Sequence, residues 1–312
     1  NGSGGGLHTA GALTLMTSTV SNNAANSGGG LRNNGGTVIV QNTVFDNNRT
    51  LTTPPNNGGA ITNDNTGVLT VTNSSFSHNT SLQGGAISNK AYGSSQLTQL
   101  VVSGSTFIGN SATSDGGAIQ NAPFNGSRAW ITIVSSEFYT NTAQAGNGGG
   151  IANEGTLTIT ATSFDSNTAT AANDGSGNWG GGHGGAIENR ATFTNRATLT
   201  IDQSHFTNNT AIGVAEGGGN GGAIDTENQQ PGGLSTLLVR DSVFTGNRAL
   251  GRLGGAINNF SGNGGVSTVN LENSTISGNS TDGTGGGISN HGTLTITNST
   301  IADNTAAWSG GG

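Results

Sequence analysis

Residues 285–306 read G-G-G-I-S-N-H-G-T-L-T-I-T-N-S-T-I-A-D-N-T-A, and this stretch decides the fold. A glycine run leads into Ile288, and Asn290 follows two positions later. An alternating T-L-T-I-T segment comes next at residues 293–297, and then I-A-D-N occupies residues 301–304. Because period-two alternation of apolar and polar residues is typical of short strands with one buried face, the stretch predicts several short strands.

The same order of motifs recurs along the whole chain. The first motif is a glycine run that ends at Leu7, Leu31, Ile61, Ile87, Ile119, Ile151, Ile187, Ile224, Ile257 and Ile288. The second motif is an apolar residue followed three positions later by Asn23, Asn48, Asn79, Asn110, Asn141, Asn167, Asn209, Asn247, Asn279 and Asn304. A fixed order repeated about every 31 residues indicates a solenoid, in which each repeat forms one coil.

Each coil is expected to hold three short strands, at G-G-A-I-x-N, T-L-T-I-T and S-T-F-x-x-N. Stacking of like strands about 4.8 Å apart gives a parallel β-helix, an all-β fold, right-handed by the preference of parallel crossovers. Phenylalanines from Phe45 to Phe244 should form a column inside it. Asparagines two positions after the Leu or Ile should form a hydrogen-bonded ladder, which Thr9 and Thr226 interrupt.

Composition excludes several classes of protein. Glycine contributes 57 of 312 residues and charged residues only 8%, which by itself is typical of disorder, but the periodicity argues for a folded solenoid. A net charge of −7 with nine Lys plus Arg argues against a nucleic-acid partner. Without cysteine the chain has no disulfide or thiolate metal site, and no apolar run is long enough to span a membrane.

Residues 1–312 are interpreted as a single β-helix domain that is a segment of a longer chain or a filament subunit. The sequence begins at Asn1 without Met, and neither end shows the polar cap that hides open strand edges in solenoids. End-to-end stacking into a homo-oligomer or filament is therefore expected.

Candidate binding residues lie where coils are longer than the minimum, because solenoids place insertions on their surfaces as loops. The candidates are Tyr92, Phe124, Arg128, Trp130, Phe193, Arg196 and Phe260 on one face, and Asp174, Trp179, His183 and Glu216 on the other. Aromatic side chains on such loops are suited to stacking on sugar rings. The alternative is that loops of adjacent coils pack their aromatic side chains on each other.

Catalytic and cofactor signals are weak. Parallel β-helices of the pectin-lyase type include polysaccharide lyases and hydrolases, which need paired carboxylates or a calcium cluster with a base. The acids near the second motif are scattered, so no catalytic residues, metal site or cofactor are predicted. Asp174 to Asn178 only partly matches a calcium loop, and the threonine rows of an ice-binding solenoid are interrupted at Val101 and Leu238.

The recurring G-G-A-I and F-x-x-N motifs resemble those of the chlamydial polymorphic outer-membrane proteins and of large secreted bacterial β-helix repeat proteins. The resemblance extends over nearly the whole chain, although the chain lacks the cysteines of the chlamydial proteins. It implies a bacterial cell-surface or extracellular location and an autotransporter-like role in adhesion or self-association. The leading interpretation is a non-enzymatic adhesin or fibre-forming β-helix with a glycan, host-cell or neighbouring-cell ligand. The alternatives are a polysaccharide-binding or polysaccharide-degrading β-helix and, more remotely, an ice-binding solenoid.

Overall fold

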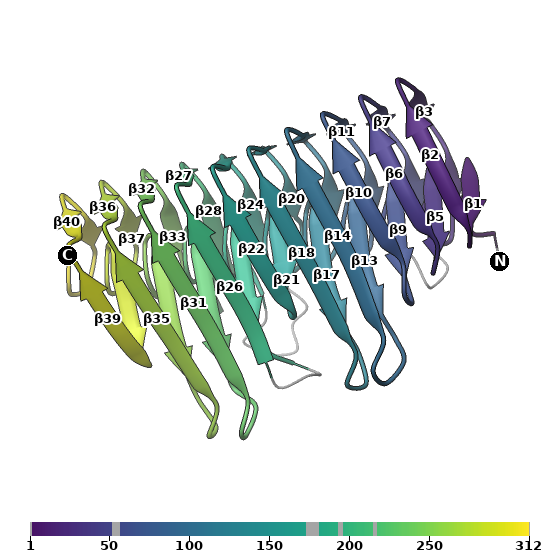
Figure 1. Cartoon of the computed structure of the whole chain (residues 1–312). Helices are drawn as coiled ribbons and strands as arrows, with labels where there is room; N and C mark the ends of the chain where they lie inside the picture. Colours follow the sequence, from purple (N-terminus) through teal and green to yellow (C-terminus); the bar gives the residue numbers. More distant parts are fainter. Residues whose placement is uncertain (1, 52–56, 173–180, 193–195, 215–216, 312) are drawn as a thin grey trace.

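The computed structural model describes residues 2–51, 57–172, 181–192, 196–214 and 217–311. These residues form a stack of coils that advances along one axis, with the chain ends at opposite ends of the stack (Figure 1). Like strands pair in parallel from each coil to the next, and the described residues contain no helix. The prediction of an all-β parallel β-helix is therefore confirmed.

Sheet 1 contains the glycine-motif strands. Its strands, in order, are β1 (Leu7–Thr9), β5 (Leu31–Asn34), β9 (Ile61–Asp64), β13 (Ile87–Ala91), β17 (Ile119–Pro123), β21 (Ile151–Asn153), β25 (Ile187–Arg190), β30 (Ile224–Asn228), β34 (Ile257–Ser261) and β38 (Ile288–His291). The second glycine of each motif allows the coils to approach closely. At Gly149, for example, an added Cβ would lie 2.2 Å from the carbonyl oxygen of Gly185 in the next coil.

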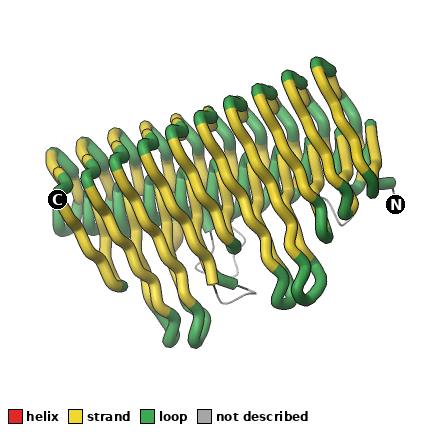
Figure 2. The backbone as a smooth tube through the Cα atoms, viewed as in Figure 1, coloured by secondary structure: helices red, strands yellow, loops and turns green. Residues whose placement is uncertain are grey.

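Sheet 2 contains the alternating segments. Its strands are β2 (Ala12–Met16), β6 (Thr37–Gln41), β10 (Val68–Thr72), β14 (Leu97–Ser103), β18 (Arg128–Val134), β22 (Thr156–Thr160), β26 (Arg196–Asp202), β31 (Leu234–Arg240), β35 (Val266–Glu272) and β39 (Thr293–Thr297). Residues such as Ile131 and Ile133 point into the core, and the alternate residues point outward. The turns before β14, β18, β31 and β35 are four or five residues long and protrude from one edge of the stack (Figure 2).

Sheet 3 carries the aromatic column. Its strands are β3 (Thr19–Ser21), β7 (Val44–Asp46), β11 (Ser75–Ser77), β15 (Thr106–Ile108), β19 (Glu137–Tyr139), β23 (Ser163–Asp165), β27 (His205–Thr207), β32 (Val243–Thr245), β36 (Thr275–Ser277) and β40 (Thr300–Ala302). The rings from Phe45 to Phe244 stack nearly parallel, with centroids 4.6–5.0 Å apart. The predicted phenylalanine column is confirmed.

Sheet 4 corrects the prediction of three strands per coil. Its strands are β4 (Ala24–Ala25), β8 (Arg49–Thr50), β12 (Thr80–Ser81), β16 (Ser111–Ala112), β20 (Thr142–Ala143), β24 (Thr168–Thr170), β28 (Thr210–Val214), β33 (Arg248–Leu250), β37 (Ser280–Thr281) and β41 (Thr305–Ala306), and β29 (Gly217–Gly218) pairs antiparallel with β28. Most of these strands have only two or three residues, which is too short to show an alternating pattern. Each coil therefore has four strands.

Three hydrogen-bonded ladders join the coils. In the second motif, each asparagine amide donates to the asparagine Oδ1 of the next coil at 2.9–3.0 Å, from Asn23 to Asn304. The sheet 1 ladder runs from Asn33 to Asn189 and there donates to Thr226. A third ladder links the Ser and Thr hydroxyls two positions before the second motif, such as Ser74 and Ser105, to the backbone of the preceding coil. The ladder of sheet 1 was predicted, and the other two were not.

Candidate functional site

A notch interrupts the edge of sheet 2 because one coil has a short turn. Strand β22 follows β21 after two residues, whereas four residues separate β17 from β18. In the register of the sheet, Trp130 pairs with Thr156, and Thr156 pairs with Thr198. Strands β18 and β26 each extend two residues beyond this level, to Arg128 and Arg196, where β22 has no counterpart. Because paired strands lie about 4.8 Å apart, these extensions face each other across roughly 10 Å.

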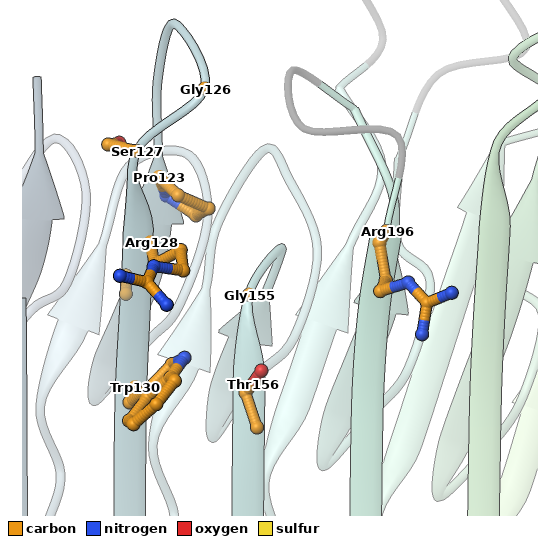
Figure 3. A pocket seen from close by; sticks show the side chains of 9 residues that line it. Pro123, Gly126, Ser127, Arg128, Trp130, Gly155, Thr156 and Arg196 are labelled. Carbon is orange, nitrogen blue, oxygen red and sulfur yellow. The ribbon is translucent and has the colours of Figure 1, made fainter. Parts of the chain in front are cut away.

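The notch has a volume of about 430 Å³. It is lined by Pro123, Gly126, Ser127, Arg128, Ala129, Trp130, Gly155, Thr156 and Arg196. Figure 3 shows Arg128 and Trp130 on one wall, Gly155 and Thr156 in the middle and Arg196 on the strand beyond them. Three of the predicted binding residues, Arg128, Trp130 and Arg196, therefore border one surface feature.

The chemistry of the notch is aromatic and cationic. Trp130 remains 43% exposed, and the Arg128 guanidinium carbon lies 5.6 Å from the centroid of its ring, within cation–π range. The lining includes two arginines and no carboxylate. The notch can therefore offer a flat apolar surface beside the positive charge of Arg128.

The other aromatic candidates in the described residues pack on their neighbours. Tyr92 and Phe124 stack with centroids 5.5 Å apart, and the Lys90 ammonium lies 5.6 Å from the Phe124 centroid. Burial raises the pKa of Tyr92 to about 12. Phe260 makes a tilted contact with His291. The alternative of loop aromatic side chains packing on each other therefore describes these residues better than a free stacking platform does.

Four predicted binding residues, Phe193, Asp174, Trp179 and Glu216, lie outside the described residues. His183 is described and is buried. Its Nδ1 lies 3.3 Å from Oδ2 of Asp225. It is thus part of a charged surface that the sequence analysis did not predict.

That surface is the outward face of sheet 1, and we call its charged residues the ionic row: Arg32, Asp64, Lys90, Glu188, Arg190, Asp225 and Glu227. They point away from the core, yet most are buried because side chains that precede the glycine motifs cover them. The Lys90 ammonium, for example, donates to Asn57 at 3.0 Å and to Gln83 at 2.7 Å. Burial lowers the pKa of Lys90 to about 8.

The acidic end of the ionic row is a network. Arg190 lies 3.4 Å from Glu188 and 3.2 Å from Glu227, and Asn258 donates to Asp225 at 2.6 Å. Burial raises the pKa of Glu188 and of Asp225 well above the usual range. In contrast, the positive charges of His183 and Arg190 hold the pKa of Glu227 below its usual value despite burial.

Paired carboxyl groups with divergent pKa values are typical of acid–base catalysis, but these groups are enclosed. Asp225 is 0% exposed and Glu188 is 2% exposed. A neighbouring cavity of about 420 Å³ is lined by Arg190, Ala191, Thr192, Glu227, Gln229 and Gln230 and includes neither of them. Within the described ranges, no group of three or more His, Asp or Glu side chains is arranged to hold a metal ion.

Sequence similarity supports the resemblance seen in the motifs. The family model of the Chlamydia polymorphic membrane protein repeat matches residues 73–90, 104–122 and 203–227. Three segments of the chain are thus similar to the polymorphic membrane protein repeat. No curated protein and no solved structure gives a significant match to the chain.

Each matched repeat covers the same part of the coil. The segment 104–122 contains β15, β16 and most of β17, which belong to sheets 3, 4 and 1, and the other two segments correspond to it. None of the three includes a strand of sheet 2 or a residue that lines the notch. The three matched segments thus belong to the scaffold of ladders and stacked rings, and the notch lies outside them.

Proposed function

We propose that the chain is an adhesive segment of a bacterial surface protein, a non-enzymatic β-helix that presents a ligand-binding notch on its side. The observation that carries the proposal is the division of the coil. Polymorphic membrane protein repeats account for the scaffold, and an exposed aromatic and cationic notch lies on the part that the repeats leave out. Among the described residues, no helix is long and apolar enough to cross a membrane.

The scaffold suits a structural role at a surface. Its ladders satisfy buried amides coil after coil, so each coil is held to its neighbours by the same set of contacts. Such a rod keeps a binding site at a fixed position and orientation. Stacking of separate chains through their terminal coils stays a prediction, which sedimentation velocity over a range of concentrations would check.

The enzymatic and ice-binding alternatives have less support. Enclosure of Asp225 and Glu188 keeps a polymeric substrate away from the carboxyl pair with raised pKa values. The threonine column on the outward face of sheet 2 is interrupted, because Thr132 and Thr158 share their column with Val101 and Leu238. Ordered threonine arrays are therefore confined to a few coils.

The test is to display the chain on a non-adherent bacterium and to count the cells that attach to cultured epithelial cells and to each other. We expect attachment above that of a strain that displays an unrelated β-helix. In parallel, purified protein with polygalacturonate and calcium should release no new reducing ends. Attachment equal to the control strain, or release of reducing ends, would contradict the proposal.

A further inference from the structure

We propose that the notch binds a carboxylated sugar, a hexuronate or a sialate, which stacks on Trp130 and pairs its carboxylate with Arg128. This inference rests on the proposed adhesive function and assigns a ligand class to it. The notch lies at the edge of sheet 2, between the extended strands β18 and β26 (Figure 3). Its volume of about 430 Å³ falls within the usual range of roughly 300–1,000 Å³ for small-molecule sites.

The ring of the ligand is recognised by Trp130. An exposed indole presents a flat face with negative partial charge, and the C–H groups on one face of a pyranose carry positive partial charge. Thr156, directly beside Trp130 in the register, adds a hydroxyl that can donate to or accept from a sugar hydroxyl. Neither residue contributes to the core, so both are available for binding.

The carboxylate of the ligand is recognised by Arg128. A guanidinium presents a planar fork of donors that matches the two oxygens of a carboxylate, and its contact with the Trp130 ring holds that fork at the wall of the notch. Arg196, on the strand beyond β22, is part of the lining, but its guanidinium points away from Trp130 in Figure 3, so the carboxylate is assigned to Arg128. The notch therefore places an aromatic ring beside a positive charge, which matches the pyranose ring and the carboxylate of an acidic sugar.

The charge of the whole chain explains why a small acid fits better than a polyanion. The net charge is −7, which repels a highly charged polymer at long range. Screening at physiological ionic strength limits that repulsion to about 8 Å, so Arg128 still dominates inside the notch. A neutral sugar leaves its guanidinium without a new partner and gains only the stacking.

The experiment is isothermal titration calorimetry of the purified chain with two acidic probes and their neutral counterparts. Trigalacturonate is compared with its fully methyl-esterified form, and sialyllactose is compared with lactose. We expect one of the acidic probes to bind at least about tenfold more tightly than its neutral counterpart, because charge-assisted pairing is lost in the latter. The two pairs distinguish a hexuronate from a sialate. Equal affinity within both pairs overturns the inference.

Matched variants locate the site. Thr156→Glu places a carboxylate in the notch and should weaken acid binding at least about tenfold more than Thr156→Gln, which loses the same hydroxyl and has the size of Glu but adds no charge. Trp130→Ala and Arg128→Gln should weaken binding similarly. Their controls are Trp308→Ala, an exposed tryptophan elsewhere, and Arg240→Gln on the same sheet. Acid binding that Thr156→Glu leaves unchanged overturns the inference.

The outcomes separate this inference from the proposed function. If the displayed chain attaches to cells but neither acid binds, the notch has another ligand and the adhesive function stands. If an acid binds through Trp130 but displayed cells do not attach, the ligand class stands and adhesion is wrong. The circular dichroism spectrum of each variant, compared with that of the unmodified chain, ensures that loss of binding reflects the site.

Discussion

Two buried surfaces of the coil differ in whether their residues repeat. At the corner after sheet 3, every coil supplies an asparagine, and each Oδ1 from Asn48 to Asn304 accepts from the asparagine before it. On the outward face of sheet 1, one column reads Ser88, Gln120, Ala152, Glu188, Asp225 and Asn258 along successive coils.

The difference shows in the hydrogen bonding. In the described residues, the buried side-chain atoms without a hydrogen-bond partner include one atom from each of Ser88, Gln120, Glu188, Asp225 and Asn258, all in that single irregular column. The asparagine ladder after sheet 3 has none. A residue that repeats in every coil makes the same hydrogen bonds at every level. In an irregular column, each pair of neighbouring side chains needs its own hydrogen-bond arrangement.

The largest predicted effect comes from breaking the repeated column of rings. Phe138→Ala should destabilise the chain by about 3–5 kcal/mol, because it removes a ring that is 1% exposed and stacked on both sides. The measurement is urea unfolding followed by circular dichroism. Phe138→Ile is the control and should cost less than about 1.5 kcal/mol, since Ile276 occupies this position in another coil. Equal losses for both variants would show that the stacked ring, and not the buried apolar volume, determines the stability at this position.

Breaking the asparagine ladder should have the next largest effect. Asn141→Ala removes the acceptor of the Asn110 amide and backbone N–H, and the donor to the Phe107 carbonyl. Because these groups are buried, we expect a loss of roughly 3 kcal/mol in the free energy of unfolding. Asn47→Gly removes an exposed hydrogen bond between two asparagine side chains, at a corner where Asn47 has a φ of 51°. It should change the free energy of unfolding by less than about 0.5 kcal/mol. A similar loss at both sites would contradict the role of burial.

The repeated features were accessible from the sequence because each leaves the same residue at the same position in every coil. The sheet 1 ladder and the phenylalanine column were predicted from such positions, and the asparagine ladder after sheet 3 leaves the same kind of signal. Sheet 4 could not be predicted, since a strand such as Thr142–Ala143 is too short for alternation to be visible. The Ser and Thr ladder had a visible signal, but its meaning depends on backbone donors that a sequence does not show.

The candidate site was only partly accessible from the sequence. Trp130, Arg128 and Arg196 were identified as separate loop residues, and their grouping depends on register and on the short turn before β22. The ionic row was missed because its residues differ from coil to coil and form no motif. A column with no pattern is recognised only when the register is known.

The irregular column should respond to pH, unlike the ladders. The pKa of Asp225 is raised by burial and by the nearby Glu227 carboxylate, against the opposing effects of Asn258 and Arg190, and His183 also faces it. The folded state therefore holds a proton that the unfolded state loses above about pH 4. The stability that Asp225 contributes is present below that pH and is lost as pH rises through the folded-state pKa.

Asp225→Asn should consequently stabilise the chain at pH 7.5, on the order of 1–2 kcal/mol, and have little effect at pH 4. The amide keeps an acceptor for the hydrogen bond from Asn258. Urea midpoints of both proteins at the two pH values provide the measurement. Asn141→Gln serves as the comparison outside the ionic row, because its effect should be the same at both pH values. A midpoint for Asp225→Asn that falls at pH 7.5 would show that the ionised form is the favoured one.

The smallest effect comes from repairing the irregularity at Thr226 in the sheet 1 ladder. Thr226 accepts from Asn189 at 3.0 Å, but Oδ1 of Asn259 in the next coil is buried and has no partner among the described residues. Thr226→Asn supplies an amide that can accept from Asn189 and donate to Asn259, as asparagine does at equivalent positions such as Asn121. We expect a gain of about 1 kcal/mol, the usual net value of one buried hydrogen bond. Thr226→Val, which has no hydroxyl, should instead lose a similar amount because the Asn189 amide loses its acceptor. If Thr226→Asn is no more stable than the unmodified chain in urea unfolding, a regular ladder adds no stability. The contrast between repeated and irregular columns would then fail at the position that tests it most directly.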